Sequence, residues 1–260
     1  MKLDLHVHTG HSFDSSGEPA EIIRAAEVVG LDAIAITDHD TMSAVGLVKK
    51  LSSKITIIPG MEITSMQGTH VIGLFLQSEI ISRDIFEIID EIHAQDGLVL
   101  MPHPFREGSG FLSHRFHEKI YDGDQFEKII EQIDLVEAFT YRADPEDIID
   151  TGKFLAVHPE LAVSSGSNAH TITDIGKAYF EIEEFDTDNL NEIKYALLDA
   201  PRLLRYEAYS ADNDETVVKT ARHEGKSGFF GKIVDAALGP VMSSIKNLYR
   251  KPNKTDGGQS

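Results

Sequence analysis

Apolar runs of strand length alternate with helical patterns along the first 210 residues of the chain. Runs such as 32–37 and 135–140 are apolar without alternation, which is typical of strands buried on both faces. Apolar residues between the runs recur at helical spacing, so helices are expected over 18–29, 43–51, 81–94, 124–133, 145–157 and 189–198. About seven such units predict a parallel sheet closed into a small (β/α) barrel, complete or incomplete.

Residues that can bind metal ions stand at the ends of these runs. His6 and His8 share one face of the first strand with Asp4, because successive strand side chains point to opposite faces. Two adjacent imidazoles suit a divalent transition metal, although an isolated pair also fits the wet face of an amphipathic strand. Further candidates lie at other run ends, namely His39, Glu62, His70, His103 and His170. Since ligands gather at the carboxyl ends of parallel strands, one shared site is expected there.

Composition narrows the class of protein. The chain has 260 residues, and no Gly/Ser/Pro-rich linker divides the first 210. It contains no cysteine, which excludes a disulfide framework, a thiolate nucleophile and cysteine-ligated zinc or iron–sulfur sites. Asp4 and two histidines interrupt any signal-peptide pattern, and no apolar stretch approaches membrane-spanning length. We therefore expect a cytoplasmic domain of enzyme size.

Charge is unevenly distributed along the chain. The net charge is −19, yet residues 219–254 contain eight Lys or Arg against two Asp or Glu and carry +6. Because Asp256 adds one negative charge, residues 1–218 carry −24. So acidic a body repels long nucleic acid, whereas a local metal cluster can still attract a small phosphorylated substrate.

The end of the chain has a different pattern from the body. Apolar residues recur at helical spacing among basic ones from Phe229 to Tyr249. Such a basic amphipathic segment suits an anionic lipid surface or nucleic acid, or packs against its own domain or a second subunit. We therefore divide the chain into one domain at 1–210 and a C-terminal extension at 211–260.

Six short motifs hold most of the candidate ligands. They are Asp4-Leu5-His6-Val7-His8-Thr9, Thr37-Asp38-His39-Asp40-Thr41, Gly60-Met61-Glu62, Gly68-Thr69-His70-Val71-Ile72-Gly73, Pro102-His103-Pro104-Phe105 and Gly166-Ser167-Asn168-Ala169-His170. In content and order they resemble the motifs of the PHP (polymerase and histidinol phosphatase) family, over residues 1 to about 208. The resemblance implies a distorted seven-stranded (β/α) barrel with two or three divalent metal ions at its mouth. Since no polymerase accompanies the domain, the chain looks most like the stand-alone metal-dependent phosphoesterases.

The resemblance also implies which residues hold the ions. His6, His8, Glu62 and Asn168 would hold one, Glu62 would bridge to a second held by His70 and His103, and Asp14, His39 and His170 would hold a third. His11 is an alternative to Asp14, since both lie in the loop after the first strand. Glu62, His39 and Asp14 are expected to act directly in catalysis. A mixed imidazole and carboxylate shell suits Mn, Fe or Zn. Asp38 and Asp40 are expected to contact ligands rather than ions.

One position departs from the family pattern. Asn168 stands where the family usually has an aspartate, and an amide oxygen can ligate a metal but brings no negative charge.

Two arginines are candidates for phosphate binding. Arg106 and Arg142 both follow strand-like runs and could reach the same mouth. A guanidinium group forms a bidentate fork with phosphate oxygens, although a surface ion pair is the alternative in so acidic a body.

These observations predict a metal-dependent phosphoesterase that acts on a small phosphomonoester or nucleotide. The alternatives are an exonuclease or phosphodiesterase on short oligonucleotides, and a degenerate metal-binding regulatory protein, for which Asn168 is the best support.

Overall fold

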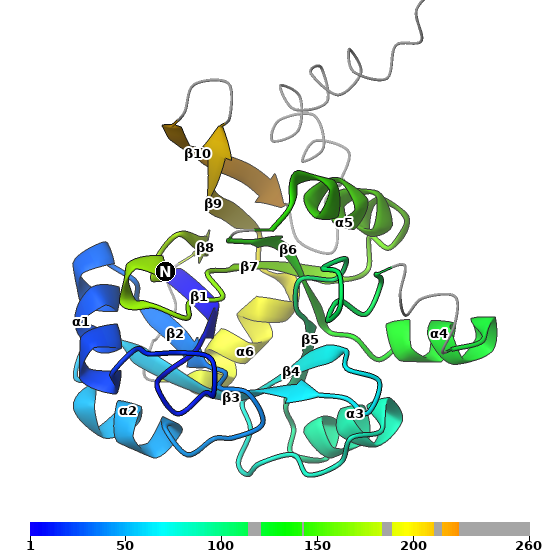
Figure 1. Ribbon diagram of the computed structural model, residues 1–260, viewed down its shortest axis with the longest axis horizontal. Coiled ribbons are helices and arrows are strands. Elements are labelled where there is room, and N and C mark those ends of the chain that lie inside the picture. Colours follow the sequence, from blue (N-terminus) through cyan, green and yellow to red (C-terminus); the bar gives the residue numbers. More distant parts are fainter. Residues whose placement is uncertain (114–120, 142, 184–188, 211–214, 224–260) are drawn as a thin grey trace, which may run out of the picture.

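Ten strands and six α-helices occur in the residues that the structure, a computed structural model, describes: 1–113, 121–141, 143–183, 189–210 and 215–223 (Figure 1). The strands are β1 (Lys2–Val7), β2 (Ala33–Ile36), β3 (Thr56–Thr64), β4 (His70–Leu74), β5 (Leu98–Met101), β6 (Leu135–Thr140), β7 (Ala162–Gly166), β8 (Ala178–Ile182), β9 (Arg202–Ser210) and β10 (Glu215–His223). The helices are α1 (Pro19–Val29), α2 (Val45–Leu51), α3 (Ile85–Ala94), α4 (Gly123–Ile130), α5 (Pro145–Val157) and α6 (Leu190–Asp199).

The strands form one sheet in the order β10-β9-β8-β1-β2-β3-β4-β5-β6-β7. Strands β1, β2 and β3 run parallel, as do β5, β6 and β7, but β4 is antiparallel to both of its neighbours. The expectation of a parallel sheet was therefore wrong at β4, and also at β8 and β9, because β8 pairs antiparallel with both β1 and β9. Only residues 65–69 join β3 to β4, and so short a connection closes a hairpin but cannot make a parallel crossover.

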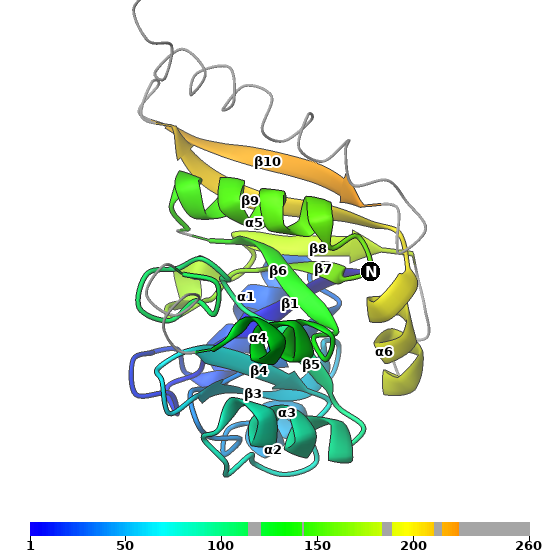
Figure 2. The ribbon, with the colours of Figure 1, turned by 90° about the vertical axis from the view of Figure 1, so that its right-hand side faces the viewer.

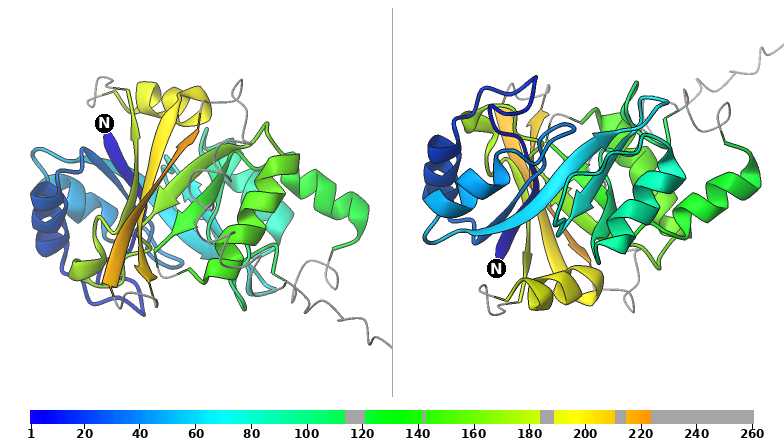
Figure 3. Two further views of the ribbon diagram at one scale, coloured as in Figure 1. Left: turned by 90° about the horizontal axis from the view of Figure 1, so that it is seen from above. Right: turned by 90° about the horizontal axis from the view of Figure 1, so that it is seen from below.

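The sheet curls until its end returns to β1 (Figure 3). The amide of His8 donates to the carbonyl of Ala169 at 3.0 Å, and the amide of Ala169 donates to the carbonyl of His6 at 3.3 Å. Strand β8 pairs with the beginning of β1, at Lys2 and Leu3. The molecule is thus a mixed α/β fold around a nearly closed, barrel-like sheet. The expected seven-stranded barrel is not confirmed, because β8, β9 and β10 extend the same sheet.

Strand β2 lies between two layers of apolar side chains. Ala33 and Ala35 belong to the larger core, while Ile34 and Ile36 belong to a second core with the buried faces of α1 and α2. These two helices pack side by side along one flank (Figure 1). Because both faces of β2 are buried, the run is apolar without alternation, as the sequence indicated.

Local hydrogen bonds set where the helices begin and end. Helix α1 ends at Gly30, whose φ of 77° is left-handed and accessible to glycine without strain. Helix α3 begins at Ile85 rather than at the expected residue 81, because the Asp84 side chain accepts from the amides of Phe86 and Glu87.

Strands β9 and β10 form an antiparallel hairpin at one edge of the sheet (Figure 2). The predicted boundary between domain and extension, at 210/211, falls between these two strands. Residues 224–260, which include the whole basic amphipathic segment, lie outside the described residues, so the domain division stays a prediction. In the described part of the chain, no helix has the length and apolar content needed to cross a membrane.

Candidate metal centre

Glu62 lies at the centre of a group of histidines. Its carboxylate, 1% exposed, projects from β3, and five imidazoles approach its two oxygens at 2.9 to 3.6 Å. His70 and His103 contact Oε1, whereas Oε2 is approached by the Nε2 atoms of His6, His8 and His39. His6 lies in β1 and His8 directly follows it, and with Glu62 the group comes from five segments of the chain, so the fold brings it together.

Strand direction explains why these histidines meet. His8, His39 and His103 directly follow or lie just beyond the carboxyl ends of β1, β2 and β5. His70 instead opens β4, and because β4 runs antiparallel, its first residue lies at the same end of the sheet. The register pairs Thr64 with His70, which places His70 one pleat beyond Glu62.

A second group adjoins the first on its more open side. Asp14 Oδ2 lies 3.3 Å from His39 Nε2 and 3.4 Å from His170 Nδ1. The rings of His8 and His170 stack with centroids 4.3 Å apart. His11, the alternative to Asp14, lies apart from this group and shares a 2.8 Å hydrogen bond with Ser43.

Potential ligand atoms gather in three groups, each within 4.8 Å. The groups are His6/Glu62/His103, His8/His39/Glu62 and His8/Asp14/His170. The structure therefore brings the expected residues together, while it groups His6 with His103 and shares His8 between two groups. The assignment of each residue to a particular ion stays a prediction.

Burial and charge set the protonation of the site. Burial lowers the pKa of His8, His39 and His170, and lowers that of His103 to about 4, so these imidazoles are neutral at neutral pH. Neutral imidazole is the form that binds a metal ion.

Two members of the site favour the charged form. Burial opposes ionisation of Glu62, but His6 and the hydrogen bonds from the other histidines outweigh it and hold its pKa well below the usual range. Burial likewise disfavours protonated His6, yet the carboxylates of Glu62 and Glu137 raise its pKa to about 10. A metal ion that binds His6 has to displace this proton.

The donor set fits a divalent metal ion. The Nε2 atoms of His6 and His8 point at each other across 3.1 Å, beside a carboxylate that already has several nitrogen partners. A mixed shell of imidazole nitrogens and carboxylate oxygens is the donor set of zinc, manganese and iron sites.

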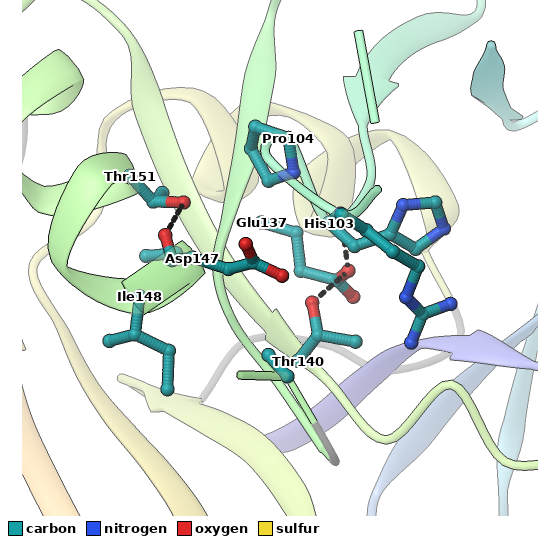
Figure 4. Close-up of a pocket in the computed structure, with 10 residues that line it drawn as sticks. His103, Pro104, Glu137, Thr140, Asp147, Ile148 and Thr151 are labelled. Atoms are coloured by element: carbon teal, nitrogen blue, oxygen red, sulfur yellow. Dashed lines mark hydrogen bonds between the residues drawn. The ribbon is translucent and has the colours of Figure 1, made fainter. Parts of the chain in front are cut away.

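Glu137 is a part of the site that the sequence analysis did not find. It lies on β6, is 1% exposed, and its Oε1 is 3.2 Å from His6 Nδ1. Its Oε2 accepts from the backbone amide of His103 at 3.0 Å and from the Thr140 hydroxyl at 2.5 Å (Figure 4). The available signal was one charged residue within the otherwise apolar run 135–140.

Two predicted supporting carboxylates also have defined partners. Asp38 accepts from the amide and the hydroxyl of Thr9 at 2.6 and 2.8 Å, and burial raises its pKa to about 6. Asp40 accepts from the amide of Thr64 at 2.9 Å and pairs with Arg83 at 2.5 Å. Both carboxylates thus hold the loops that carry His8 and His39.

Asn168 and Arg106 meet beside the histidines. In one orientation of the Asn168 amide its Oδ1 lies 2.9 Å from His170 Nε2. In the other, which gives the donors of Arg106 an acceptor, the oxygen accepts from Arg106 Nη1 at 2.8 Å and Nη2 at 3.1 Å. The amide nitrogen then faces three imidazole Nε2 atoms, 2.9 Å from that of His170 and 3.2 Å from those of His6 and His8. Arg106 also lines a small pocket with His103, Glu137 and Asp147, between β5, β6 and α5 (Figure 4). Arg142 lies outside the described residues.

Fold and donor set together support a metal-dependent hydrolase. The family model of the PHP domain matches residues 4–150, more than half of the chain. The chain therefore belongs to the PHP family.

Known proteins are similar to this chain in sequence. Two uncharacterized proteins of Methanocaldococcus jannaschii are similar to it, one 35% identical over 138 residues, which cover 47% of this chain and 79% of the relative. The other is 28% identical over 257 residues, which cover 97% of this chain and 100% of the relative. A 5'-3' exoribonuclease of Haemophilus influenzae is 32% identical over 78 residues, 28% of each chain.

A solved structure has the same fold. It is a two-domain protein of Bacteroides vulgatus that contains a predicted PHP-like metal-dependent phosphoesterase. The TM-score is 0.62 at 15% identity, and the match covers 85% of each chain. At this identity the likeness concerns the fold alone.

Proposed function

We propose that the protein hydrolyses phosphate esters with bound divalent metal ions, and that its substrates are small phosphomonoesters or nucleotides. The observation that carries the proposal is Glu62, a buried carboxylate whose two oxygens face five imidazoles, next to the guanidinium of Arg106. An anionic substrate needs such a combination of metal ligands and a fixed cation.

The proposed ligands are His6, His8, Asp14, His39, Glu62, His70, His103, Asn168 and His170, with manganese, iron or zinc as the ion. Two or three such ions, when bound, would supply Lewis-acid polarisation of the phosphoryl group and a water of lowered pKa. Glu62 is placed to hold two positions at once, because each of its oxygens faces a different set of histidines.

The residues of the open side would face the substrate. The side chains of Asp14 and His170 are 33% and 27% exposed, whereas Glu62 is buried, so substrate enters on the Asp14 side. His39 Nε2 and Asp14 Oδ2 lie 3.3 Å apart on this side. As ligands they would act in catalysis by holding an ion next to the substrate, where it would polarise the phosphoryl group. Arg106 would bind phosphate oxygens through the N–H groups that Asn168 does not use, and Arg142 is proposed as a second clamp.

A second candidate function is removal of nucleotides from short oligonucleotides. The exoribonuclease of Haemophilus influenzae favours it, through similarity over 28% of this chain. The charge of −24 on residues 1–218 argues against long nucleic acid as a substrate, since like charges repel.

The test compares three substrates with one protein. Metal-free protein is reloaded with manganese and assayed on a chromogenic phosphomonoester, the matching diester and a short single-stranded oligonucleotide. Faster turnover of the monoester supports the proposed function, and preference for the oligonucleotide supports the second candidate. No turnover of any substrate by fully metal-loaded protein contradicts both and favours a regulatory metal-binding protein.

A further inference from the structure

Arg106 has an uncharged partner in a strongly acidic protein. Elsewhere in the described part of the chain, Arg83 pairs with Asp40 and Arg205 pairs with Glu181, whereas the buried Arg202 donates to backbone carbonyls. Arg106 has no carboxylate within 4.0 Å among the described residues. In the amide orientation that gives it an acceptor, both of its terminal nitrogens donate to the oxygen of Asn168. No carboxylate contacts it directly, although Glu137 and Asp147 line the same pocket, so part of its positive charge is available to a substrate.

The backbone around Arg106 is fixed next to the site. Its amide donates to the carbonyl of His103 at 3.0 Å, and its carbonyl accepts from the amide of Gly110 at 2.8 Å. A Cβ on Gly110 would lie 2.6 Å from the nitrogen of Arg106, so glycine allows the loop to close this tightly. The guanidinium is thus held at both ends, by its own loop and by Asn168.

Asn168 is built into the opposite side of the mouth. It is 7% exposed and has a φ of 45°, a left-handed conformation that asparagine tolerates better than most residues. In the orientation that gives Arg106 an acceptor, its amide oxygen contacts the guanidinium of Arg106, and its amide nitrogen contacts the imidazoles of His6, His8 and His170. The reverse orientation would set its NH2 group against the donors of Arg106 and leave them without an acceptor.

We propose that Asn168 is a positioning residue for Arg106, and that its neutral amide makes the site selective for phosphate dianions, hence for phosphomonoesters over diesters. The inference deepens the proposed function and rests on it. An aspartate at position 168 would hold the same fork but form a bidentate ion pair and cancel much of its charge. The neutral amide holds the guanidinium of Arg106 in place without pairing with its charge, so that the charge can attract the substrate.

The number of charges on the substrate decides the preference. A phosphomonoester carries about 1.5 to 2 negative charges at neutral pH, since its second pKa is about 6, whereas a diester carries one. An arginine that no carboxylate contacts attracts a dianion more strongly than a monoanion, because the Coulomb energy grows in proportion to the charge of the substrate. In the orientation that contacts Arg106, the amide oxygen points away from the imidazoles, so on this inference Asn168 positions Arg106 and is removed from the set of metal ligands proposed above.

The experiment is a double-mutant cycle on binding of inorganic phosphate. Calorimetry measures the dissociation constant for manganese-loaded wild type, N168A, R106Q and the double variant, with metal content and circular dichroism recorded for each. Each single substitution should weaken phosphate binding about tenfold or more, as expected for a charge-assisted hydrogen-bonded pair. The double variant should bind no more weakly than R106Q, because both changes remove one unit.

The N168D variant tests whether phosphate binding depends on the position of the Arg106 guanidinium or on its unpaired charge. It keeps an acceptor for the fork but adds a negative charge, so phosphate binding should weaken about tenfold while metal content is retained. Dimethyl phosphate, a monoanion, should lose less affinity than inorganic phosphate in the same variant.

Three results would overturn the proposal. They are additive losses in the cycle, wild-type phosphate affinity in N168A, and loss from N168A of a metal ion that R106Q retains, which would make Asn168 a ligand. The proposed reaction is tested separately, by turnover of a phosphomonoester by the wild type. If the wild type turns over a phosphomonoester but the cycle is additive, the positioning role of Asn168 is wrong and the proposed reaction stands. If the cycle is coupled but there is no turnover, the proposed reaction is wrong and the positioning role stands.

Discussion

Glu137 holds His6 from behind: its Oε1 lies 3.2 Å from His6 Nδ1, while Glu62 faces the Nε2 of the same ring at 3.1 Å. The imidazole therefore lies between two buried carboxylates on β3 and β6. A carboxylate behind a ligating histidine fixes the tautomer and the ring orientation and raises its basicity. Glu137 also accepts from the amide of His103, so one carboxylate supports two candidate ligands.

Replacing Glu137 by Gln is expected to weaken metal binding by about ten- to a hundredfold, the usual effect of losing an outer-shell partner. The amide keeps the size of the side chain but can no longer accept at both oxygens. Manganese affinity is measured by competition with a chelator. Glu131→Gln, an exposed carboxylate at the end of α4, is the control and should bind like the wild type. Equal affinity of the E137Q variant and the control would contradict the role.

Gly166→Ala should disturb the same contact from the other side. An added Cβ would overlap Glu137 Oε1 and lie 2.7 Å from the Cβ of His6. We expect a loss of about 1 to 3 kcal/mol of unfolding free energy from overpacking, together with weaker metal binding. Denaturant unfolding and manganese titration measure the two effects.

Gly46→Ala is the matched control for that substitution. Nothing lies within 4 Å of its added Cβ, and the residue is inside α2. Alanine there should stabilise the protein by up to about 1 kcal/mol, because glycine is the poorer helix former. If the two variants were equally stable, the close approach of β7 to Glu137 and His6 would have no energetic weight.

Glu62→Gln and His8→Ala should each reduce turnover by at least about a hundredfold while the protein stays folded, because a multinuclear site acts as a unit. Turnover and the melting temperature are measured on the same preparations. His93→Ala, an exposed histidine paired with Asp134, should keep full activity. Wild-type turnover in the E62Q or H8A variant, with metal still bound, would refute the assignment.

Purified protein should carry two or three equivalents of divalent metal and lose activity on chelation. Removal should also lower the melting temperature, since an ion that binds the folded state alone stabilises it by mass action. Lowering the pH should release metal, because the ligating imidazoles must be neutral and protons compete for them. Elemental analysis and melting curves with and without chelator check this. Less than one equivalent after manganese or iron reconstitution would be inconsistent with the site.

Truncation after His223 should leave turnover of a small substrate nearly unchanged. All the candidate ligands lie between His6 and His170, whereas the removed sequence is the basic amphipathic extension. Size-exclusion chromatography and binding to anionic vesicles should instead differ between the full chain and the truncated one. A truncated protein that is folded and metal-loaded but inactive would show that the extension belongs to the active site.

Apolar patterning was enough to predict the alternation of strands and helices, because burial on two faces leaves a clear signature, as at β2. It was also enough to place candidate ligands at strand ends. The reversed direction of β4 was missed, although the short span 65–69 was a usable signal for a hairpin.

Contacts between distant segments could not be predicted in the same way. Glu137 is 131 residues from His6 in the chain, and its role depends on β6 lying across the sheet from β1. The contact of Arg106 with Asn168 likewise depends on the register of β7 and on a left-handed backbone at Asn168. Periodicity reports which face a side chain takes but not which remote partner it meets there.

The hydrogen bonds of Ala169 with His6 and His8 close the barrel-like sheet at the same place where the candidate ligands meet. His8 comes from one side of this seam and His170 from the other, and their ligand atoms lie within one 4.8 Å group with Asp14. An ion held by that group would therefore connect the two ends of the sheet and stabilise their contact. Amide hydrogen exchange at His8 and Ala169 should then slow on metal loading more than exchange in α3, which lies away from the seam. Metal binding and closure of the sheet at this seam would then be thermodynamically coupled.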